Sequence, residues 1–367
     1  MTPAESVARL RLARAEGIGP QTFYRLLARH GTAEAALRAL AEAPDLRVTV
    51  GDAAAAAREH DRVLSMGGVW VHHGSDPYPP LLALLDDAPP VLAVIGDPTL
   101  LTARQVAIVG ARNASAGGRR IAEDLAEALA EQEVTITSGL ARGVDAAAHE
   151  GALRRGATVA VLPGGLDVAY PPENRDLQDR IAEGGALVAE APLGTAPLAR
   201  HFPKRNRIVA GLSLGVVVVE AALRSGTLIT ARLAAEAGRE IYAVPGSPLD
   251  PRCQGSNDLL RQGAHLCENA ADVLDTLPAT PHALPLFRAP RETSRTPARA
   301  PVPAPASEPG EAATTLLDLI GPTPLPVDEV LRRCHLSPSE ARATLLDLEL
   351  EGLIQSLPGN RVVRSGA

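Results

Sequence analysis

Short apolar runs alternate with longer amphipathic stretches between residues 104 and 277. The six runs are VAIVG (106–110), VTITSG (134–139), TVAVLPGG (158–165), ALVAEAP (186–192), GVVVVEA (215–221) and EIYAVPG (240–246). Strands that are buried on both faces are apolar at consecutive positions, and helical stretches between them indicate crossover connections. The pattern therefore predicts an α/β fold with an extended Rossmann-like, doubly wound and mainly parallel sheet.

The chain before this region has a different pattern. Residues 1–65 have apolar positions at helical spacing and predict a small helical domain. Its GIGPQT turn (17–22) resembles a helix-hairpin-helix, whose amides can bind a phosphate, although a plain turn between two helices is the simpler interpretation. Residues 66–103 contain proline pairs and one candidate extra strand, VLAVIG (91–96). We expect residues 66–277 to form one extended Rossmann-like domain.

The C-terminal part divides in two. Residues 278–312 are rich in Pro and Ala and predict a linker. Residues 313–367 resemble a winged helix, in which Ser337 and Glu340 form a capping-box pattern. Acids outnumber the single arginine of SPSEARATLLDLELEGLI, which favours a protein-contact or regulatory module over a helix that reads DNA. The wing, NRVVR, still offers a contact to a DNA backbone.

Composition limits the partners. The net charge of −7 means that any nucleic-acid contact must come from a local basic patch. The three cysteines, Cys253, Cys267 and Cys334, are far apart in the sequence, which argues against disulfides and against a structural zinc site. No signal-like segment and no apolar run of transmembrane length occurs, so we expect a soluble, cytoplasmic protein with no membrane partner.

Basic residues follow several of the predicted strands. Ligands of open parallel sheets bind at the carboxyl ends of the strands, where the strand order reverses. If the order is 3-2-1-4-5-6, three loops meet there: the loop with Arg112, the SGLARG loop with Arg142, and the segment containing HFPKRN. The first loop lacks a G-x-G-x-x-G fingerprint and Lys204 follows a proline, so neither a dinucleotide nor a Walker A site is expected. We therefore expect no cofactor and no metal.

Two loops have the composition of an anion site. Gly139 and Gly143 permit tight turns before a helix, so the amides of SGLARG suit a phosphate, and Arg142 adds a guanidinium. The similar SGT (225–227) is better explained as a helix N-cap.

The HFPKRN segment contains Lys204, the only lysine in the chain. Pro203 suits the first position of a helix, which places Lys204, Arg205 and Arg207 in its first two turns. Cations there oppose the helix dipole at a cost of about 0.3–1 kcal/mol each, so they indicate a ligand that supplies negative charge. Phe202 is either a platform for a base, worth roughly 1–3 kcal/mol, or part of the core. A track of cations beside an aromatic residue is typical of single-strand binding.

Five long motifs occur in order: GAR (110–112), TSGLARGVDAAAH (137–149), GGLDVAYPPEN (164–174), HFPKRNRIVAGLS (201–213) and VVEAALRSGTLITA (218–231). With them the chain resembles the DNA-processing protein A family, also called DprA or Smf. The resemblance implies a single-stranded DNA-binding protein that protects incoming DNA and loads the RecA recombinase during natural transformation. It also implies a homodimer formed through the Rossmann domain, with no nucleotide cofactor.

The motifs and the charge pattern together give the expected site. The expected DNA-binding residues are Arg112, Ser138, Gly139, Arg142, Gly143, Phe202, Lys204, Arg205, Asn206 and Arg207. Whether Asn174 contacts DNA or only supports the fold stays open. NDLLRQGAHL (257–266) is the candidate for self-association, and packing against the sheet is the alternative interpretation.

Two other functions are consistent with parts of the sequence. LPGG (162–165) and SGTLITARLAAE resemble the pattern of lysine-decarboxylase-like nucleotide hydrolases, in which Glu190 and Glu220 would act as acid and base. The two halves of that pattern are about sixty residues apart here, and that group lacks HFPKRN. A regulator that binds double-stranded DNA through the terminal modules is the third hypothesis. We expect a binding protein without catalytic residues.

Overall fold

The computed structural model describes residues 1–42, 48–278 and, with gaps, 316–364. The chain divides into two compact units, Met1–Pro290 and Arg291–Ala367. The first unit begins with the helices α1 (Pro3–Ala13), α2 (Pro20–His30), α3 (Ala33–Glu42) and α4 (Ala53–Ser65). Gly19 precedes α2 and proline opens it, so GIGPQT joins two helices as the pattern predicts. Buried Leu12 and Phe23 form the core of these helices.

A nine-stranded sheet forms the body of this unit. Its strands are β1 (Val69–His72), β2 (Val91–Gly96), β3 (Gln105–Val109), β4 (Thr135–Ser138), β5 (Thr158–Leu162), β6 (Ala186–Ala189), β7 (Gly215–Val218), β8 (Glu240–Ala243) and β9 (His265–Leu266). The six predicted strands and the extra strand at 91–96 are confirmed. All pairs among β3 to β9 are parallel. At one edge of the sheet, β2 pairs antiparallel with both β6 and β1.

The strand order differs from the one considered above. It is β1-β2-β6-β5-β4-β3-β7-β8-β9, so the six predicted strands follow the order 4-3-2-1-5-6 and not 3-2-1-4-5-6. The fourth predicted strand, β6, extends the first half of the sheet beyond β5, and the antiparallel β2 covers its outer edge. The order therefore reverses between β3 and β7.

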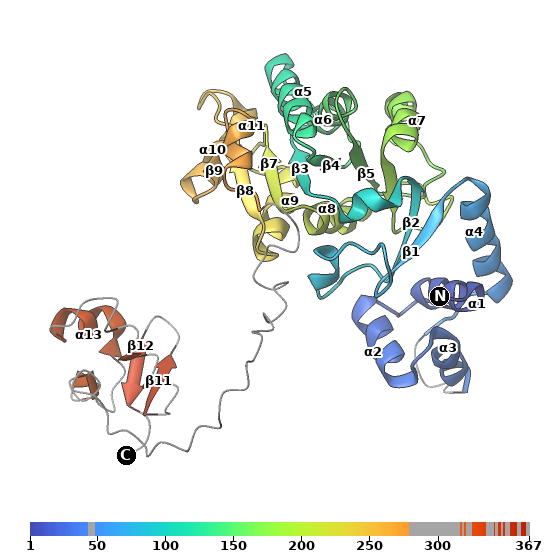
Figure 1. Cartoon of the computed structure of the whole chain (residues 1–367), viewed down its shortest axis with the longest axis horizontal. Coiled ribbons are helices and arrows are strands. Elements are labelled where there is room, and N and C mark those ends of the chain that lie inside the picture. The colour runs from blue at the N-terminus through green and yellow to red at the C-terminus, as the bar shows by residue number, and fades with distance from the viewer. Residues whose placement is uncertain are drawn as a thin grey trace, which may run out of the picture. The chain divides into compact units, whose positions relative to one another are not determined.

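Helices cover both faces of the sheet (Figure 1). One face carries α5 (Ala116–Glu131), α6 (Val144–Ala152) and α7 (Arg175–Gly184), and the other carries α8 (His201–Leu212) and α9 (Gly226–Glu236). The remaining helices are α10 (Gln254–Arg261), α11 (Ala270–Leu274) and the short 3₁₀ turns η1 (Leu82–Leu84), η2 (Pro98–Thr102), η3 (Pro172–Asn174) and η4 (Pro251–Cys253). α10 packs beside β8, with Leu259 partly buried against the core.

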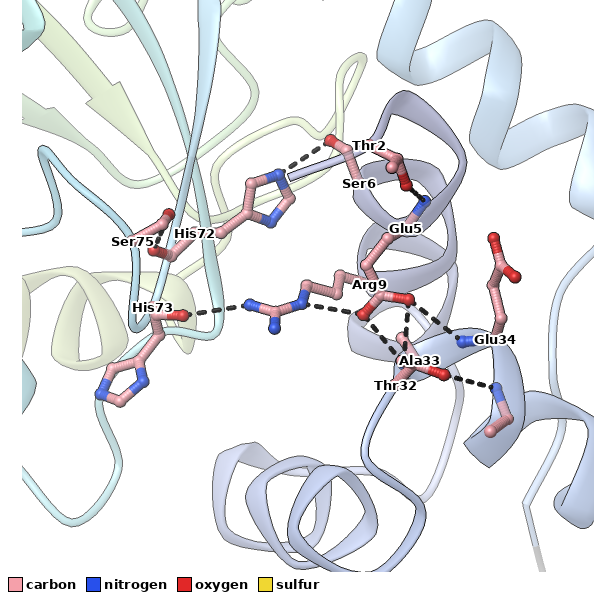
Figure 2. Close-up of polar contacts among 11 residues, drawn as sticks. Thr2, Glu5, Ser6, Arg9, Thr32, Ala33, Glu34, His72, His73 and Ser75 are labelled. Carbon is pink, nitrogen blue, oxygen red and sulfur yellow. Dashed lines mark hydrogen bonds and ion pairs between the residues drawn. The ribbon is translucent and has the colours of Figure 1, made fainter.

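Polar contacts join α1 to the sheet. The hydroxyl of Ser6 lies 2.8 Å from Nε2 of His72 and 3.1 Å from Nε2 of His60, and all three residues are buried. Arg9 donates to the carbonyl of His73 at 3.1 Å, beside the contact between Ser6 and His72 (Figure 2). These contacts fix the helical segment on the edge strand β1.

The second unit contains a small sheet with the strand order β10-β12-β11. Its described elements are β10 (Leu325–Pro326), α13 (Val327–Arg333), β11 (Ile354–Leu357) and β12 (Arg361–Arg364). The expected capping box of Ser337 and Glu340 and nearly all of the expected linker lie outside the described residues. No described helix is both long enough and apolar enough to cross a bilayer.

Candidate nucleic-acid interface

A crevice of about 840 Å³ opens where the strand order reverses, at the carboxyl ends of β3 and β7. Its walls come from the loop after β3 and from the first turns of α8 and α9. The HFPKRN motif reaches this crevice because α8 crosses from β6 back to β7 and packs against β5, β4 and β3 on the way. Arg112, Phe202, Arg205 and Asn206 line the crevice together.

Phe202 is half-buried in the crevice wall. The Cζ atom of Arg112 lies over its ring, 4.5 Å from the centroid, and Tyr170 meets it edge to face with 5.7 Å between the ring centroids. A cation over an aromatic ring at a partly exposed site is worth about 0.5–1 kcal/mol. The ring belongs to none of the apolar clusters of the described residues, and the guanidinium of exposed Arg112 lies against it.

Arg205 forms the floor of the crevice. Only 6% of it is exposed, its Nη1 lies 3.8 Å from Asp145 and 3.4 Å from the carbonyl of Val161, and its Nε has no hydrogen-bond partner. Burial raises the pKa of the Asp145 carboxyl, and the Arg205 guanidinium opposes that shift. Burial also lowers the pKa of Arg205, but a guanidinium stays charged at neutral pH. The floor thus holds a buried cation with few partners.

The SGLARG loop is packed tightly over Arg205. A side chain at Gly139 would collide with the Arg205 guanidinium, and Gly143 has a φ of +76° that favours glycine. The hydroxyl of fully buried Ser138 donates to the carbonyl of Ile108 at 2.6 Å.

The sequence suggested that the amides of this loop are free for a phosphate, but at least one of them already has a partner. The carboxylate of Asp145 already accepts from the Ala141 amide at 3.4 Å. Asn174 donates to the carbonyls of Leu140 and Ala141 at 3.0 and 3.3 Å, so it supports this loop.

Arg142 lies beside the crevice, in a depression that it shares with Arg112 and Arg119. Its Nε lies 2.5 Å from Glu173, and the two side chains are 65% and 49% exposed. An exposed ion pair of this kind contributes little to stability, so a phosphate can compete for Arg142.

The three cations of HFPKRNR have different surroundings. Lys204 is exposed, and no described carboxylate pairs with it. Arg207 is largely buried, and its Nη2 donates to both carboxylate oxygens of Glu190 at 2.6 Å. The expectation that all three await a ligand is therefore wrong for Arg207. The helix also begins at His201, so Pro203 is its third residue and not its first.

The two carboxylates of the enzyme hypothesis have structural partners. Glu190 pairs with Arg207, and Glu220 accepts from the amide and hydroxyl of Ser115 at 2.9 and 2.6 Å. Ser115 is the N-cap of α5, so Glu220 stabilises the start of that helix.

Among the crevice residues that sequence reasoning missed are Tyr170, Arg224 and Arg252. Tyr170 lies within the GGLDVAYPPEN motif, and Arg224 directly precedes SGT, so their neighbours carried the signal. Arg252 comes from the turn after β8, which no motif marked.

Three family descriptions match successive parts of the chain. Residues 3–63 match a DprA-like N-terminal HHH domain and residues 299–360 match a DprA winged helix domain. Residues 69–278 match DNA recombination-mediator protein A, which covers more than half of the chain and includes the whole sheet. The chain belongs to the DNA recombination-mediator protein A family. The matched residues include the crevice and parts of both flanking modules.

Individual family members support this assignment. Protein Smf of Escherichia coli (strain K12) is 43% identical over 290 residues, which are 78% of this chain and 75% of that protein. The X-ray structure of DNA processing protein A from Streptococcus pneumoniae superposes with a TM-score of 0.65 at 33% identity, covering 76% of this chain and 99% of that one. DNA processing protein A from Helicobacter pylori is described for its single-stranded DNA binding mode. Its structure has a TM-score of 0.52 at 32% identity, and the match covers 57% of this chain and 94% of that one.

Proposed function

We propose that this protein binds single-stranded DNA across the crevice, protects incoming DNA and loads RecA on it during natural transformation. The observation that carries the proposal is the cluster of Arg112, Phe202 and Arg205. The loop after β3 supplies one cation, and α8 supplies the other cation and the aromatic ring of the same crevice. The Helicobacter pylori relative, described for binding single-stranded DNA, supports it.

The arrangement suggests how a strand is held. A base stacks on the outer surface of the Arg112 guanidinium, which Phe202 supports from behind. Within the crevice Asn206 offers an amide to the strand. Phosphates contact Arg142 in the depression beside the crevice, and exposed Lys204 in a second adjoining hollow that shares Arg205 with the crevice. Guanidinium planes and aromatic rings accept any base, so binding of this kind is tolerant of sequence.

Several expected residues have a supporting part in this proposal. Ser138, Gly139 and Gly143 shape the loop over Arg205, and Arg207 is occupied by Glu190. We therefore assign the DNA contacts to Arg112, Arg142, Phe202, Lys204, Arg205 and Asn206.

Binding in this proposal involves no catalytic chemistry and no cofactor. Glu190 and Glu220, the acid and base of the rival hydrolase, both accept strong hydrogen bonds from their neighbours. Release of free base from nucleoside monophosphates, lost in Glu220→Gln, would contradict this part.

A competition experiment tests the proposal. Fluorescence anisotropy with a labelled oligonucleotide is measured against unlabelled single-stranded and double-stranded competitors of the same length. We expect the single strand to compete at lower concentration, because a duplex cannot present unstacked bases to the crevice. Arg112→Ala is expected to weaken binding at least tenfold, since it removes a charged contact and the stacking surface.

Arg155→Ala is the matched control. Arg155 is an exposed arginine directly after α6, just before β5 begins, and it pairs with Glu127 at 3.2 Å. It lies at the opposite end of the strands from the crevice, so its loss should leave the affinity almost unchanged. Equal competition by the duplex, or equal affinities of the two variants, would overturn the proposal.

A further inference from the structure

The wall of the crevice formed by α9 holds donors that none of the expected DNA contacts includes. Ser225 caps α9, and its hydroxyl accepts from the Thr227 amide at 3.1 Å, which confirms the N-cap interpretation of SGT. The cap leaves the amide of Gly226 without a hydrogen bond in the described part of the chain. Gly226 is exposed and lines the crevice, and a Cβ atom on it would meet nothing within 4 Å, so a ligand has room beside it.

An unpaired cation stands next to this amide. Arg224 is exposed and lines the crevice, and no carboxylate of the described residues forms an ion pair with it. Arg252 lines the same wall but is held by Asp250 at 2.7 Å, and this hydrogen bond lowers the pKa of Asp250 to about 2. Arg224 is thus the cation on this wall that a ligand can use without breaking an ion pair.

The floor of the same crevice independently indicates an anion. Arg205 is 6% exposed and its Nε is unpartnered, although a buried guanidinium normally has most of its donors satisfied. The adjacent Asn206 donates to the carbonyl of Gly226 at 3.5 Å, which ties the basic turn of α8 to the first turn of α9. The first turns of α8 and α9 therefore line the same part of the crevice.

We propose that the Gly226 amide and the Arg224 side chain form a further phosphate subsite, which holds the strand at the wall formed by the start of α9. The inference rests on the proposed binding of single-stranded DNA. α9 is 11 residues long, so the positive end of its dipole adds to the attraction. The strand then crosses the crevice from Arg112 over the Arg205 floor to α9.

A proline substitution removes the amide donor without removing the helix. Proline is favoured at the first position of a helix, and Ser225 has φ −75° and ψ 143°, the extended conformation that a residue before proline prefers. Gly226→Pro is therefore expected to keep the fold and to weaken binding of a long single-stranded oligonucleotide about tenfold, the effect of losing a hydrogen bond to a charged group. Gly226→Ala keeps the amide, has room for its methyl group, and should bind like the wild type.

Arg224→Ala supplies the second measurement, with Arg155→Ala as its control. It is expected to reduce the slope of log affinity against log salt by about 0.7, whereas the uncharged change Gly226→Pro leaves the slope unaltered. Both effects should vanish for oligonucleotides too short to reach from Arg112 to α9, which separates a strand phosphate from a free anion.

The outcomes separate this inference from the proposed function. If Gly226→Pro binds like Gly226→Ala, or Arg224→Ala like Arg155→Ala, while Arg112→Ala still loses affinity, the subsite is wrong and the function stands. If the wild type itself shows no preference for single strands, the function fails first.

Discussion

At the scale of single residues, the environment of each cation decides what it can do. Lys204 and Arg207 lie three positions apart on one helix, yet one is exposed and the other is held by Glu190. The sequence shows both as basic residues of one motif. The carboxylate that pairs with Arg207 belongs to Glu190, which directly follows β6 and lies 17 positions earlier in the chain. No local sequence pattern therefore predicts the pairing.

Exchanging these two cations for alanine should therefore affect different properties: stability for Arg207 and DNA binding for Lys204. Arg207→Ala leaves Glu190 without its partner and is expected to lower the free energy of unfolding by roughly 2–3 kcal/mol, less than for a fully buried pair because Glu190 is 27% exposed. Lys204→Ala should change stability by under about 0.5 kcal/mol but should weaken single-strand binding and reduce its salt slope by about 0.7.

Urea unfolding and anisotropy titrations of the same two variants measure both quantities. A stable Arg207→Ala protein with weakened DNA binding would show that Arg207 leaves Glu190 to contact the strand, contrary to the assignment made above.

At the scale of elements, the sequence predicted what local burial determines. The six central strands are apolar at consecutive positions because helices cover both faces, and all six were predictable. β9 has only two residues, both exposed, and therefore carries no such pattern. The strand order was not predictable, because the apolar pattern of β6 does not say which strand it pairs with. β6 pairs with β5, and the chain then returns through α8 to place β7 beside β3. The predicted meeting of HFPKRN with the loop after the first strand still holds, because α8 packs across β5, β4 and β3 and brings HFPKRN to the crevice.

The short edge strand β9 gives a test of the homodimer that the sequence resemblance implies. Leu266 on this strand is 51% exposed at the edge of the sheet that the described residues form, within the segment 257–266 that the sequence suggested for self-association. Charged side chains oppose pairing of sheet edges, so we expect the wild type to sediment as a dimer and Leu266→Arg as a monomer, while the melting temperature changes little. Sedimentation velocity measures the change.

Leu249→Arg is the matched control, because Leu249 is 90% exposed but lies in the loop after β8 and not on the edge. A wild-type protein that sediments as a monomer, or a Leu266→Arg variant that stays dimeric, would remove β9 from the interface.

At the scale of the whole molecule, an acidic chain brings several cations together at one crevice. The net charge is −7, yet the crevice is lined by Arg112, Arg205 and Arg224. The overall negative charge opposes non-specific contact with a polyanion, so a local group of cations is what guides a strand to the crevice. The sheet that carries the crevice is also the sheet on which the N-terminal helices rest, through Ser6 and His72.

That junction makes the stability of the first unit depend on pH. Burial, with a smaller contribution from Arg9, lowers the pKa of His72 from 6.5 to about 4. Between these two values the unfolded chain binds a proton that the folded chain excludes, so the stability is fully present above pH 6.5 and is lost as the pH falls toward 4. The total loss from this one group is on the order of 3 kcal/mol, with a slope approaching 1.4 kcal/mol per pH unit.

Trp70, the only tryptophan, reports on this junction because its indole donates to the carbonyl of His60 at 3.2 Å. Urea unfolding followed by its fluorescence at pH 7.0, 6.0 and 5.0 should show the midpoint falling with pH. In His72→Gln, whose amide does not titrate, the midpoint should fall less over the same range, although the variant is less stable at pH 7. Buried His149, whose pKa burial lowers to about 3, adds a loss of the same sign in both proteins, so the difference between them isolates His72. Parallel pH profiles would mean that the junction opens before His72 is protonated, and that the N-terminal helices are held to β1 mainly by other contacts.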